Sequence, residues 1–459
     1  MIDFNDKKVA VLGAGVSGVY SARLLTVLGA EVLLSDTQQK DDLKECKDIP
    51  GKVELEFGEH SRKVLQSDLI VLSPGIACDI PVLQEAAAKG IKVIGELELA
   101  CRYIDTPMIA VTGTNGKTTT TTLISEILKA DGRNVFVAGN IGEPLTKFAK
   151  PVYGEPADIG VVEVSSFQLE TIEEFRPHVA MVLNITPDHL DRYKSFPDYL
   201  QAKARIFMNQ GSRDFAVLNA DCPSTISLKS AIRSQVLVYS KTHEQTRGVF
   251  VNEGKIINRI DTEKDEVVCN VSGIKLKGVH NLENILSAVC AAAAVGVKKD
   301  VLSSVLGNFP GLEHRLEFVR EISGVEFIND SKGTNVDAVL RALESVGSDT
   351  ARSVILIIGG RNKGGDFGLL GPEIEKKVKK IVLIGEAGSQ IKDMFLNYSG
   401  TLESIMREAK DMKEAVETAY ENAGKGDTVL LSPGCSSFDM FENYKHRGRV
   451  FKTEVLKLK

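Results

Sequence analysis

The sequence lacks paired cysteines, a long apolar run and an N-terminal signal. Its seven cysteines are scattered over 459 residues and no two form a Cys-x-x-Cys pair, so we expect free thiols rather than a disulfide framework. No apolar stretch approaches the roughly 20 residues of a membrane-spanning helix. The first residues have neither the basic nor the apolar region of a signal peptide. These absences predict a cytoplasmic protein with no membrane partner.

An excess of positive charge is also missing. The chain has 56 Lys and Arg residues against 62 Asp and Glu residues, which leaves a net charge of −6. Because nucleic acids attract proteins mainly through basic charge, we expect no nucleic-acid partner. The residues that are present, 43% hydrophobic and 26% charged, are typical of a globular protein. The length predicts two to four domains.

Apolar runs of strand length alternate with helical patterns along most of the chain. This alternation predicts an α/β fold whose parallel sheets are covered by helices. The clearest runs are 8–12, 31–34, 69–72, 108–111, 160–164, 179–183, 354–358, 381–384 and 428–431. Residues 236–278 differ, because their short polar-apolar pieces predict antiparallel strands added to the middle domain. These pieces are 249–251, 255–258 and 266–271.

Two boundaries divide the pattern into three predicted domains. One boundary falls near 96–106, between a helix-like segment and the next apolar run, and the other falls near 309–312. The predicted domains are 1–97, 98–310 and 311–459. The first and third have the alternation of a Rossmann-like fold, and the middle one that of a P-loop ATPase-like, mostly parallel sheet.

A phosphate-binding loop is predicted where residues 110–119 read Ala-Val-Thr-Gly-Thr-Asn-Gly-Lys-Thr-Thr. An apolar strand leads into a turn bounded by glycines, whose backbone N–H groups can approach phosphate oxygens, and a helix follows. A lysine supplies charge and the next hydroxyl can bind Mg²⁺. The general P-loop pattern would require glycine where this chain has Val111. The residues expected at the nucleotide are Gly113, Thr114, Asn115, Gly116, Lys117, Thr118 and Thr119.

A second glycine-rich turn follows the first strand of the chain. Gly13, Gly15 and Gly18 match the dinucleotide-binding fingerprint, and Asp36 closes the next strand. This pattern predicts a diphosphate or nucleotide at the turn. The alternative is a tight turn that binds nothing. Ser73 and Gly75, which follow a later strand, are expected at the same carboxyl edge of the sheet, where ligands of open α/β folds bind.

Three residues of the middle domain are candidates for metal chemistry. Glu163 ends an apolar strand, where a P-loop enzyme needs a Mg²⁺ ligand; the alternative is a surface glutamate. His189 lies in the loop 184–191 with two carboxylates and can be a metal ligand or an acid–base group; the alternative is a solvent-facing histidine. Considered by itself, Lys203 is expected to be an ordinary exposed lysine on a helix.

At this point the motifs resemble those of the Mur ligases of peptidoglycan synthesis. They occur in order over all three predicted domains. They are T-G-T-N-G-K-T at 112–118, E-V-S-S-F-Q-L-E at 163–170, N-I-T-P-D-H-L-D at 184–191, A-K-A-R-I-F at 202–207, H-N-x-x-N at 280–284, G-L-E-H-R at 311–315, N-D-S-K-G-T-N at 329–335 and S-P-G-x-S-S-F-D at 432–439. The last two strings are most similar to the member that adds D-glutamate to UDP-N-acetylmuramoyl-L-alanine.

The resemblance implies an ATP-dependent ligase of three domains that acts through an acyl phosphate. It implies ATP and two Mg²⁺ ions, with Thr118 and Glu163 at the first ion, His189 at the second, and Lys203 present as a carbamate. The last assignment replaces the exposed-lysine interpretation. The resemblance also implies small-molecule substrates, a monomer and a cytoplasmic location.

Further site residues are assigned only by matching positions of the family. Asn284 and Arg315 would lie at adenine and phosphate, and Asp330 at the ribose of ATP. The residues expected at the UDP-sugar are Gly15, Asp36, Thr37, Ser73, Gly75 and Asn140. The residues expected near D-glutamate are Lys332, Thr334, Lys363, Ser432, Ser437 and Phe438. Gln38 stands where relatives often have an arginine after the Asp-Thr pair, which weakens the expectation of a cationic diphosphate contact.

Other functions remain open from the sequence. A nicotinamide-dependent oxidoreductase would use the first glycine turn but would leave the phosphate loop, Glu163 and His189 without a role. A non-catalytic nucleotide-binding scaffold would release no phosphate. Within the ligases, another Mur member or an enzyme similar to folylpolyglutamate synthase would share the ATP site and differ in the amino acid it adds.

Overall fold

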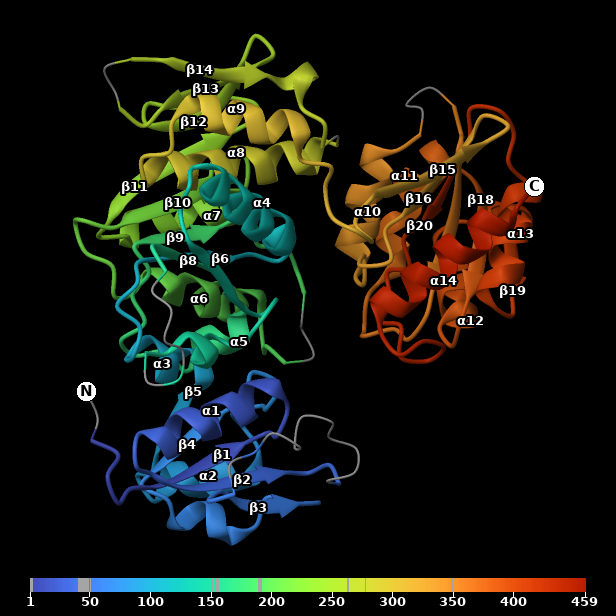
Figure 1. Cartoon of the computed structure of the whole chain (residues 1–459). Helices are drawn as coiled ribbons and strands as arrows, with labels where there is room; N and C mark the ends of the chain where they lie inside the picture. The colour runs from blue at the N-terminus through green and yellow to red at the C-terminus, as the bar shows by residue number, and fades with distance from the viewer. Residues whose placement is uncertain are drawn as a thin grey trace. The chain divides into compact units, whose positions relative to one another are not determined.

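The computed structural model describes residues 3–39, 49, 51–150, 152, 157–188, 192–261, 264–276, 278–347 and 351–459. Its contacts divide the chain into two compact units (Figure 1). Unit 1 contains Met1–Ile185, Ser195–Ile274 and Glu283–Asn308, and unit 2 contains Thr186–Lys194, Lys275–Leu282 and Phe309–Lys459. The chain therefore passes between the units several times. The division into three functional domains stays a prediction.

The first sheet, in unit 1, has five parallel strands in the order β3-β2-β1-β4-β5. Its elements are β1 (Lys8–Leu12), α1 (Val16–Val27), β2 (Glu31–Asp36), β3 (Glu54–Phe57), η3 (Arg62–Gln66), β4 (Leu69–Leu72), α2 (Pro81–Ala88), β5 (Lys92–Gly95) and α3 (Glu96–Cys101). Side chains alternate between the faces of a strand, and Ala10 and Leu12 of β1 pack with Leu83 of α2 in one buried cluster.

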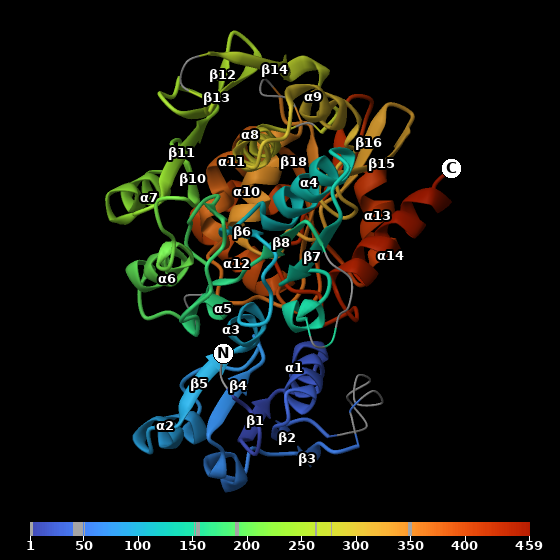
Figure 2. The ribbon, with the colours of Figure 1, turned by 60° about the vertical axis from the view of Figure 1, so that its left-hand side comes forward.

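The second sheet, also in unit 1, has nine strands in the order β14-β13-β12-β11-β10-β9-β6-β8-β7. Its strands are β6 (Met108–Thr112), β7 (Val135–Gly139), β8 (Ile159–Glu163), β9 (Val179–Val182), β10 (Phe215–Asn219), β11 (Gln235–Ser240), β12 (Gly248–Asn252), β13 (Lys255–Arg259) and β14 (Glu266–Asn270). The β12–β13 and β13–β14 pairs are antiparallel, and the others are parallel. The strands β12–β14 lie at the end of this sheet far from β7 (Figure 2). The predicted antiparallel addition is confirmed.

Helical segments lie between the strands of the second sheet and after its last strand, β14. They are α4 (Lys117–Ala130), η4 (Leu145–Phe148), α5 (Ser166–Glu170), α6 (Phe196–Ala204), η5 (Arg205–Phe207), α7 (Pro223–Ile226), η6 (Ser227–Ala231), η7 (Val271–Gly273), α8 (Val279–Ala294) and α9 (Lys299–Asn308). The helix-like pattern 284–295, which precedes the second predicted boundary, puts the start of α8 at Asn284, five residues late. Asn281 and Glu283 are polar but buried, so an apolar pattern could not include them.

The third sheet, in unit 2, has six strands in the order β15-β16-β20-β17-β18-β19, antiparallel only between β15 and β16. Its elements are β15 (Glu317–Ile322), β16 (Val325–Asn329), α10 (Val336–Ser345), β17 (Val354–Gly359), η8 (Phe367–Leu370), α11 (Gly371–Lys377), β18 (Val378–Ile384), α12 (Gly388–Tyr398), η9 (Gly400–Ile405), β19 (Met406–Ala409), α13 (Met412–Glu421), β20 (Thr428–Leu431) and α14 (Tyr444–Lys457).

Helices cover both faces of the third sheet (Figures 1 and 2). Leu356 and Ile358 of β17 are buried with residues of α10, α11 and α12, whereas Ile355 and Ile357 are buried with residues of α13 and α14. Alternate side chains of one strand thus serve two cores, which explains why the strand is an uninterrupted apolar run.

The predicted α/β class is confirmed, and each of the nine apolar runs coincides with a strand within one to three residues. Six cysteines are described and all six are free thiols; Cys46 lies outside the described residues. Within the described ranges, no helix is both long enough and apolar enough to cross a membrane.

Candidate active site

The loop between β6 and α4 requires glycine at two positions. Gly113 and Gly116 have positive φ angles of 154° and 83°, a conformation that other residues rarely adopt. A Cβ atom on Gly116 would lie 2.1 Å from Oδ1 of Asn284, which is buried. Helix α4 begins at Lys117 with no side-chain cap, so its first N–H groups remain suited to an anion at the loop.

Asn184 holds this loop in place, and it was not among the site residues predicted from the sequence. The backbone N–H groups of Thr114 and Asn115 donate to its backbone oxygen and Oδ1, at 2.9 and 2.8 Å, and its Nδ2 donates to the oxygen of Asn115 at 3.1 Å. Asn184 follows β9, which pairs directly with β6. It is the first residue of the N-I-T-P-D-H-L-D string. Its position in this string, directly after a predicted strand, is the signal by which it could have been found.

Two lysine ammonium groups converge on one carbonyl oxygen of the loop. Nζ of Lys117 donates to the oxygens of Gly113 and Thr114 at 2.8 and 2.9 Å, and Nζ of Lys203 donates to the oxygen of Gly113 at 2.9 Å. Lys203 is only 2% exposed and its Nζ lies 4.6 Å from the ring centre of Tyr199. The interpretation of Lys203 as an exposed helix lysine is therefore wrong. Two cations beside one glycine loop favour a multiply charged anion.

Glu163 lies beside the loop with one carboxylate oxygen unused. Its partner in the β6–β8 register is Val111. Glu163 is only 1% exposed, so its interpretation as a surface glutamate is wrong. Nδ2 of Asn140 donates to Oε1 at 2.6 Å, whereas Oε2 is buried with no hydrogen-bond partner. A buried, unpartnered carboxylate oxygen is costly unless a cation binds it. An oxygen ligand of this kind fits Mg²⁺; His189 lies outside the described residues.

The first glycine turn is held by two of the predicted residues. Oδ2 of Asp36 accepts from the N–H of Ala14 at 2.6 Å, and Oγ of Ser73 donates to the oxygen of Gly13 at 2.9 Å. No atom lies within 4 Å of a Cβ built on Gly15, so the turn is open where α1 begins. Two further predicted residues of this edge, Thr37 and Gly75, are exposed. Asp36 thus shapes the turn as well as ending β2.

Asp330 is the central carboxylate of the predicted site in unit 2. It is 8% exposed, and its Oδ2 accepts from Oγ of Ser432 at 2.8 Å. The charge of Arg315 lowers its pKa, against the larger effect of burial, which raises it to about 7. A Cβ on Gly333 would lie 2.4 Å from Oδ2 of Asp330, so the carboxylate would have to shift to admit a larger residue there.

Replacing Asp330 by asparagine is expected to remove a pH-dependent loss of stability. Burial raises the pKa of Asp330 from 3.8 to about 7, so the folded chain binds this proton more tightly than the unfolded chain. The contribution of the group to the free energy of unfolding is then complete below about pH 4 and is lost as the pH rises to about 7. At roughly 1.4 kcal/mol per pKa unit, the loss approaches about 4 kcal/mol.

Urea unfolding of the ligand-free protein at about pH 5 and about pH 7.5 measures this effect. The Asp330→Asn variant should gain stability relative to the parent at the higher pH. Asp393→Asn, at an exposed position of α12, is the matched control and should follow the parent at both pH values. Equal pH dependence in the parent and Asp330→Asn would contradict the assignment.

Arg447 of α14 is a second residue that the sequence did not identify. It is 1% exposed and donates to Oγ and the backbone oxygen of Ser331 at 3.1 and 2.8 Å, and to the backbone oxygens of Cys435 and Ser436 at 3.1 and 3.3 Å. Burial lowers its pKa to about 10. Arg447 therefore joins the loops that follow β16 and β20, which carry Asp330 and Ser432.

The remaining predicted residues of unit 2 lie on loops at the carboxyl ends of its strands. Nζ of Lys332 lies 4.0 Å from the ring centre of Tyr444. Ser437 is buried, Thr334 is half-buried and Lys363 is exposed. Phe438 is 64% exposed, which is unusual for a phenylalanine.

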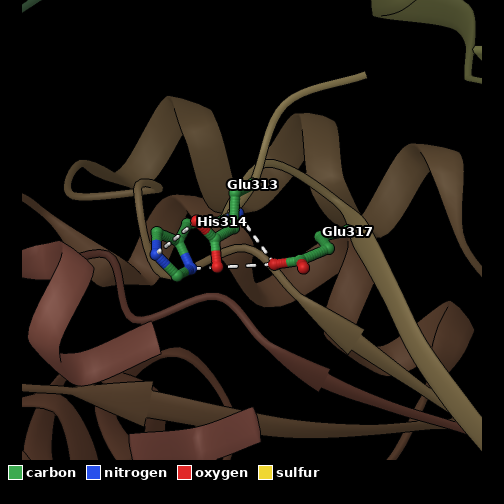
Figure 3. A group of neighbouring side chains, drawn as sticks. All are labelled: Glu313, His314 and Glu317. Carbon is green, nitrogen blue, oxygen red and sulfur yellow. Dashed lines mark hydrogen bonds and ion pairs between the residues drawn. The ribbon is translucent and has the colours of Figure 1, made fainter. Parts of the chain in front are cut away.

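Glu313, His314 and Glu317 form the one group with metal-ligand geometry that was found among the described residues (Figure 3). Nζ of Lys452 forms ion pairs with both carboxylates, at 2.9 Å to Glu313 and at closer range to Glu317. Nδ2 of Asn329 also donates to Glu317, at 3.0 Å. One ammonium group already pairs with both carboxylates, so we interpret this group as a structural ion-pair cluster rather than a metal site.

Three family descriptions match successive parts of the chain. They are "Mur ligase MurD-like, N-terminal domain" at residues 7–95, "Mur ligase middle domain" at 111–292 and "Mur ligase, glutamate ligase domain" at 314–435. The matches occur in the same order as the three sheets. Each one contains residues of the candidate site.

Full-length relatives and a solved structure agree with these matches. UDP-N-acetylmuramoylalanine–D-glutamate ligase of Pelotomaculum thermopropionicum is 47% identical over 100% of this chain and 99% of its own. The protein of that name from Caldanaerobacter subterraneus subsp. tengcongensis is 43% identical over 100% of both chains. UDP-N-acetylmuramate–alanine ligase MurC of Thermotoga maritima has a TM-score of 0.61 at 17% identity, over 99% of this chain and 100% of its own, and shows that the fold is shared. The chain belongs to the Mur ligase family.

Proposed function

We propose that this chain is an ATP-dependent ligase that joins D-glutamate to UDP-N-acetylmuramoyl-L-alanine in the synthesis of peptidoglycan precursors. The names of its full-length relatives support the substrate pair. The observation that carries the proposal is the arrangement at the phosphate loop. There Nζ of Lys117 and Nζ of Lys203 both donate to Gly113 of one glycine-bounded turn, and Glu163 ends the strand that pairs with the strand leading into it.

The chemistry explains why such a site is needed. A carboxylate is a poor acyl donor, because its leaving group would be oxide. Transfer of the γ-phosphoryl group of ATP to the substrate carboxylate gives an acyl phosphate and ADP. The amine of D-glutamate then attacks the acyl carbon, loses a proton, and phosphate leaves. The first step brings two anions together and therefore requires concentrated positive charge.

Lys117, Arg315 and two Mg²⁺ ions would supply that charge. Lys117 would neutralise the β- and γ-phosphates from the start of α4, and the loop N–H groups would bind their oxygens. Thr118 and Glu163 would hold one Mg²⁺, and His189 with a carbamylated Lys203 the second. Bound Mg²⁺ supplies further neutralisation of the transferring phosphoryl group. Asn284, which lies beside Gly116, would bind the base of the nucleotide.

Substrates are assigned to the three predicted domains. Residues 1–97 would bind the UDP end through the open turn at Gly15, with Asp36 and Ser73 shaping it. Residues 98–310 would bind ATP, and residues 311–459 the incoming amino acid. The residues proposed at D-glutamate are Lys332, Thr334, Lys363, Ser432, Ser437 and Phe438. The proposal needs no second chain and places the reaction in the cytoplasm, where ATP and nucleotide sugars are available.

Release of phosphate is the direct test. We expect ATP-dependent phosphate release only when UDP-N-acetylmuramoyl-L-alanine and D-glutamate are both present, with one ADP formed for each amide bond. A panel containing L-glutamate, L-alanine, L-lysine and meso-diaminopimelate tests the amino acid. Faster turnover with another amino acid would assign the chain to a different member of the family, and release without any acceptor would exclude a ligase.

A further inference from the structure

Asn140 and Glu163 are joined by two hydrogen bonds at the carboxyl edge of the second sheet. The backbone N–H of Asn140 donates to the backbone oxygen of Glu163 at 2.8 Å, and its Nδ2 donates to Oε1 at 2.6 Å. Asn140 follows the last residue of β7, and Glu163 is the last residue of β8. Two loops that are separate in sequence are therefore held in one fixed relation.

The close approach of the two strands depends on the residue before Asn140. Gly139 pairs with Glu163 in the β7–β8 register and has φ of 101°. A Cβ atom at this position would lie 2.3 Å from the backbone oxygen of Glu163. A larger residue would push the loops apart, so glycine and asparagine together bring the amide to the carboxylate.

The amide leaves the carboxylate with one available oxygen. Oε1 accepts from Asn140, and Oε2 is buried without a hydrogen-bond partner. A lysine or arginine in place of Asn140 would neutralise Glu163 and compete with a cation. An aspartate would repel it. A neutral donor fixes the orientation of the carboxylate without adding a charge of its own beside it.

We propose that Asn140 is a positioning residue for the divalent cation of this site. It holds Glu163 through Oε1, so that Oε2 is the oxygen that binds the cation. This inference rests on the proposed function, because it needs Glu163 to be a metal ligand. It gives Asn140 a task on the metal side of the reaction, in addition to the contact with the UDP-sugar expected from the family resemblance.

Binding of Mn²⁺ in the presence of ADP tests the inference without turnover. Free Mn²⁺ is measured by electron paramagnetic resonance in the parent, Asn140→Ala and Asn134→Ala. We expect the affinity of Asn140→Ala to fall about 10- to 100-fold, the range for loss of a hydrogen bond to a metal ligand. Asn134 precedes the other end of β7 and is exposed, so its variant should bind as the parent does. Unchanged affinity in Asn140→Ala would overturn the inference.

A double-mutant cycle separates this role from substrate binding. If Asn140 acts through Glu163, adding Asn140→Ala to Glu163→Gln should change Mn²⁺ affinity little further. Independent losses that add in full would overturn the inference. The half-saturating Mg²⁺ concentration of the reaction should rise in Asn140→Ala. A raised KM for the UDP-sugar, with the metal dependence of the parent, would instead make Asn140 a substrate residue only.

The thermal unfolding midpoint of the variant and Mn²⁺ binding by the parent separate misfolding, failure of the proposed function and failure of the inference. The backbone bond from Asn140 does not depend on its side chain, and a thermal unfolding midpoint close to that of the parent verifies that the alanine variant is folded. If Asn140→Ala unfolds, Asn140→Ser, which is smaller but polar, replaces it with the same expected loss. Failure of the parent to bind Mn²⁺ with ADP would count against the proposed function, whereas binding by the parent and by Asn140→Ala alike would count against the inference alone.

Discussion

Replacement of Lys117 by alanine is expected to lower the rate of ADP formation by at least about 10²- to 10³-fold, the loss seen when one group that stabilises transition-state charge is removed. Nζ of Lys117 already lies at the loop, 2.8 Å from the oxygen of Gly113 and 2.9 Å from that of Thr114. The side chain is therefore held where the β- and γ-phosphates are expected. No other residue of α4 projects a cation into the loop from the first turn of the helix.

Nucleotide binding and turnover are measured together in this experiment. Phosphate and ADP release under saturating substrates gives the catalytic loss, and calorimetric binding of ADP shows whether the loop still forms. Lys129→Ala is the matched control, because Lys129 lies in the last turn of the same helix and pairs with Glu126 at 2.9 Å on the surface. It should retain the activity of the parent. Turnover of Lys117→Ala near that of the parent would refute the role of Lys117 in phosphoryl transfer.

The strands were the part of the fold that the sequence specified best. Apolar runs such as 354–358 and 428–431 are buried on both faces, and a strand of that kind needs no information from distant residues to be recognised. The start of α8 was harder to predict from the sequence, because its first turns bury polar residues such as Asn281. Burial of a polar group depends on partners elsewhere in the chain.

Long-range contacts explain what the sequence did not reveal at the site. Asn184 and Lys203 reach the phosphate loop from positions 69 and 90 residues away. Arg447 binds Ser331 over 116 residues. None of these separations leaves a periodic signal. Only the family resemblance drew attention to Lys203. Asn184 begins one of the family strings but was given no role, and Arg447 lies in none of them.

The division of the chain shows the same limit. Residues 186–194 lie between β9 and α6, both in unit 1, yet they belong to unit 2. Nδ2 of Asn335, the N-cap residue of α10, donates to Oδ2 of Asp188 at 3.1 Å. A boundary drawn from composition cannot place a short excursion of this kind, because contacts such as this one join segments 147 residues apart.

Lys203 provides the second large expected effect. Its Nζ donates to Gly113 and lies against Tyr199, and it is buried beside Lys117, which donates to the same oxygen. Two interpretations compete. As an ammonium group, Lys203 would position the loop. As a carbamate, formed when the neutral amine adds CO₂ and loses a proton, it would be an anionic ligand of Mg²⁺, as we propose. Either way Lys203→Ala should lower turnover by about 10²- to 10³-fold.

Two further measurements decide between these interpretations. Short carboxylates such as formate and acetate should partly restore Lys203→Ala if an anion is needed, because they can fill the space left by the side chain. Lys203→Arg keeps the positive charge and the donor to Gly113 but cannot form the carbamate, so it should be inactive and should not respond to carboxylates. The parent protein labelled with ¹³CO₂ should show a carbamate resonance that is missing from Lys203→Arg. An active arginine variant, together with an alanine variant that no carboxylate restores, would establish the ammonium role instead.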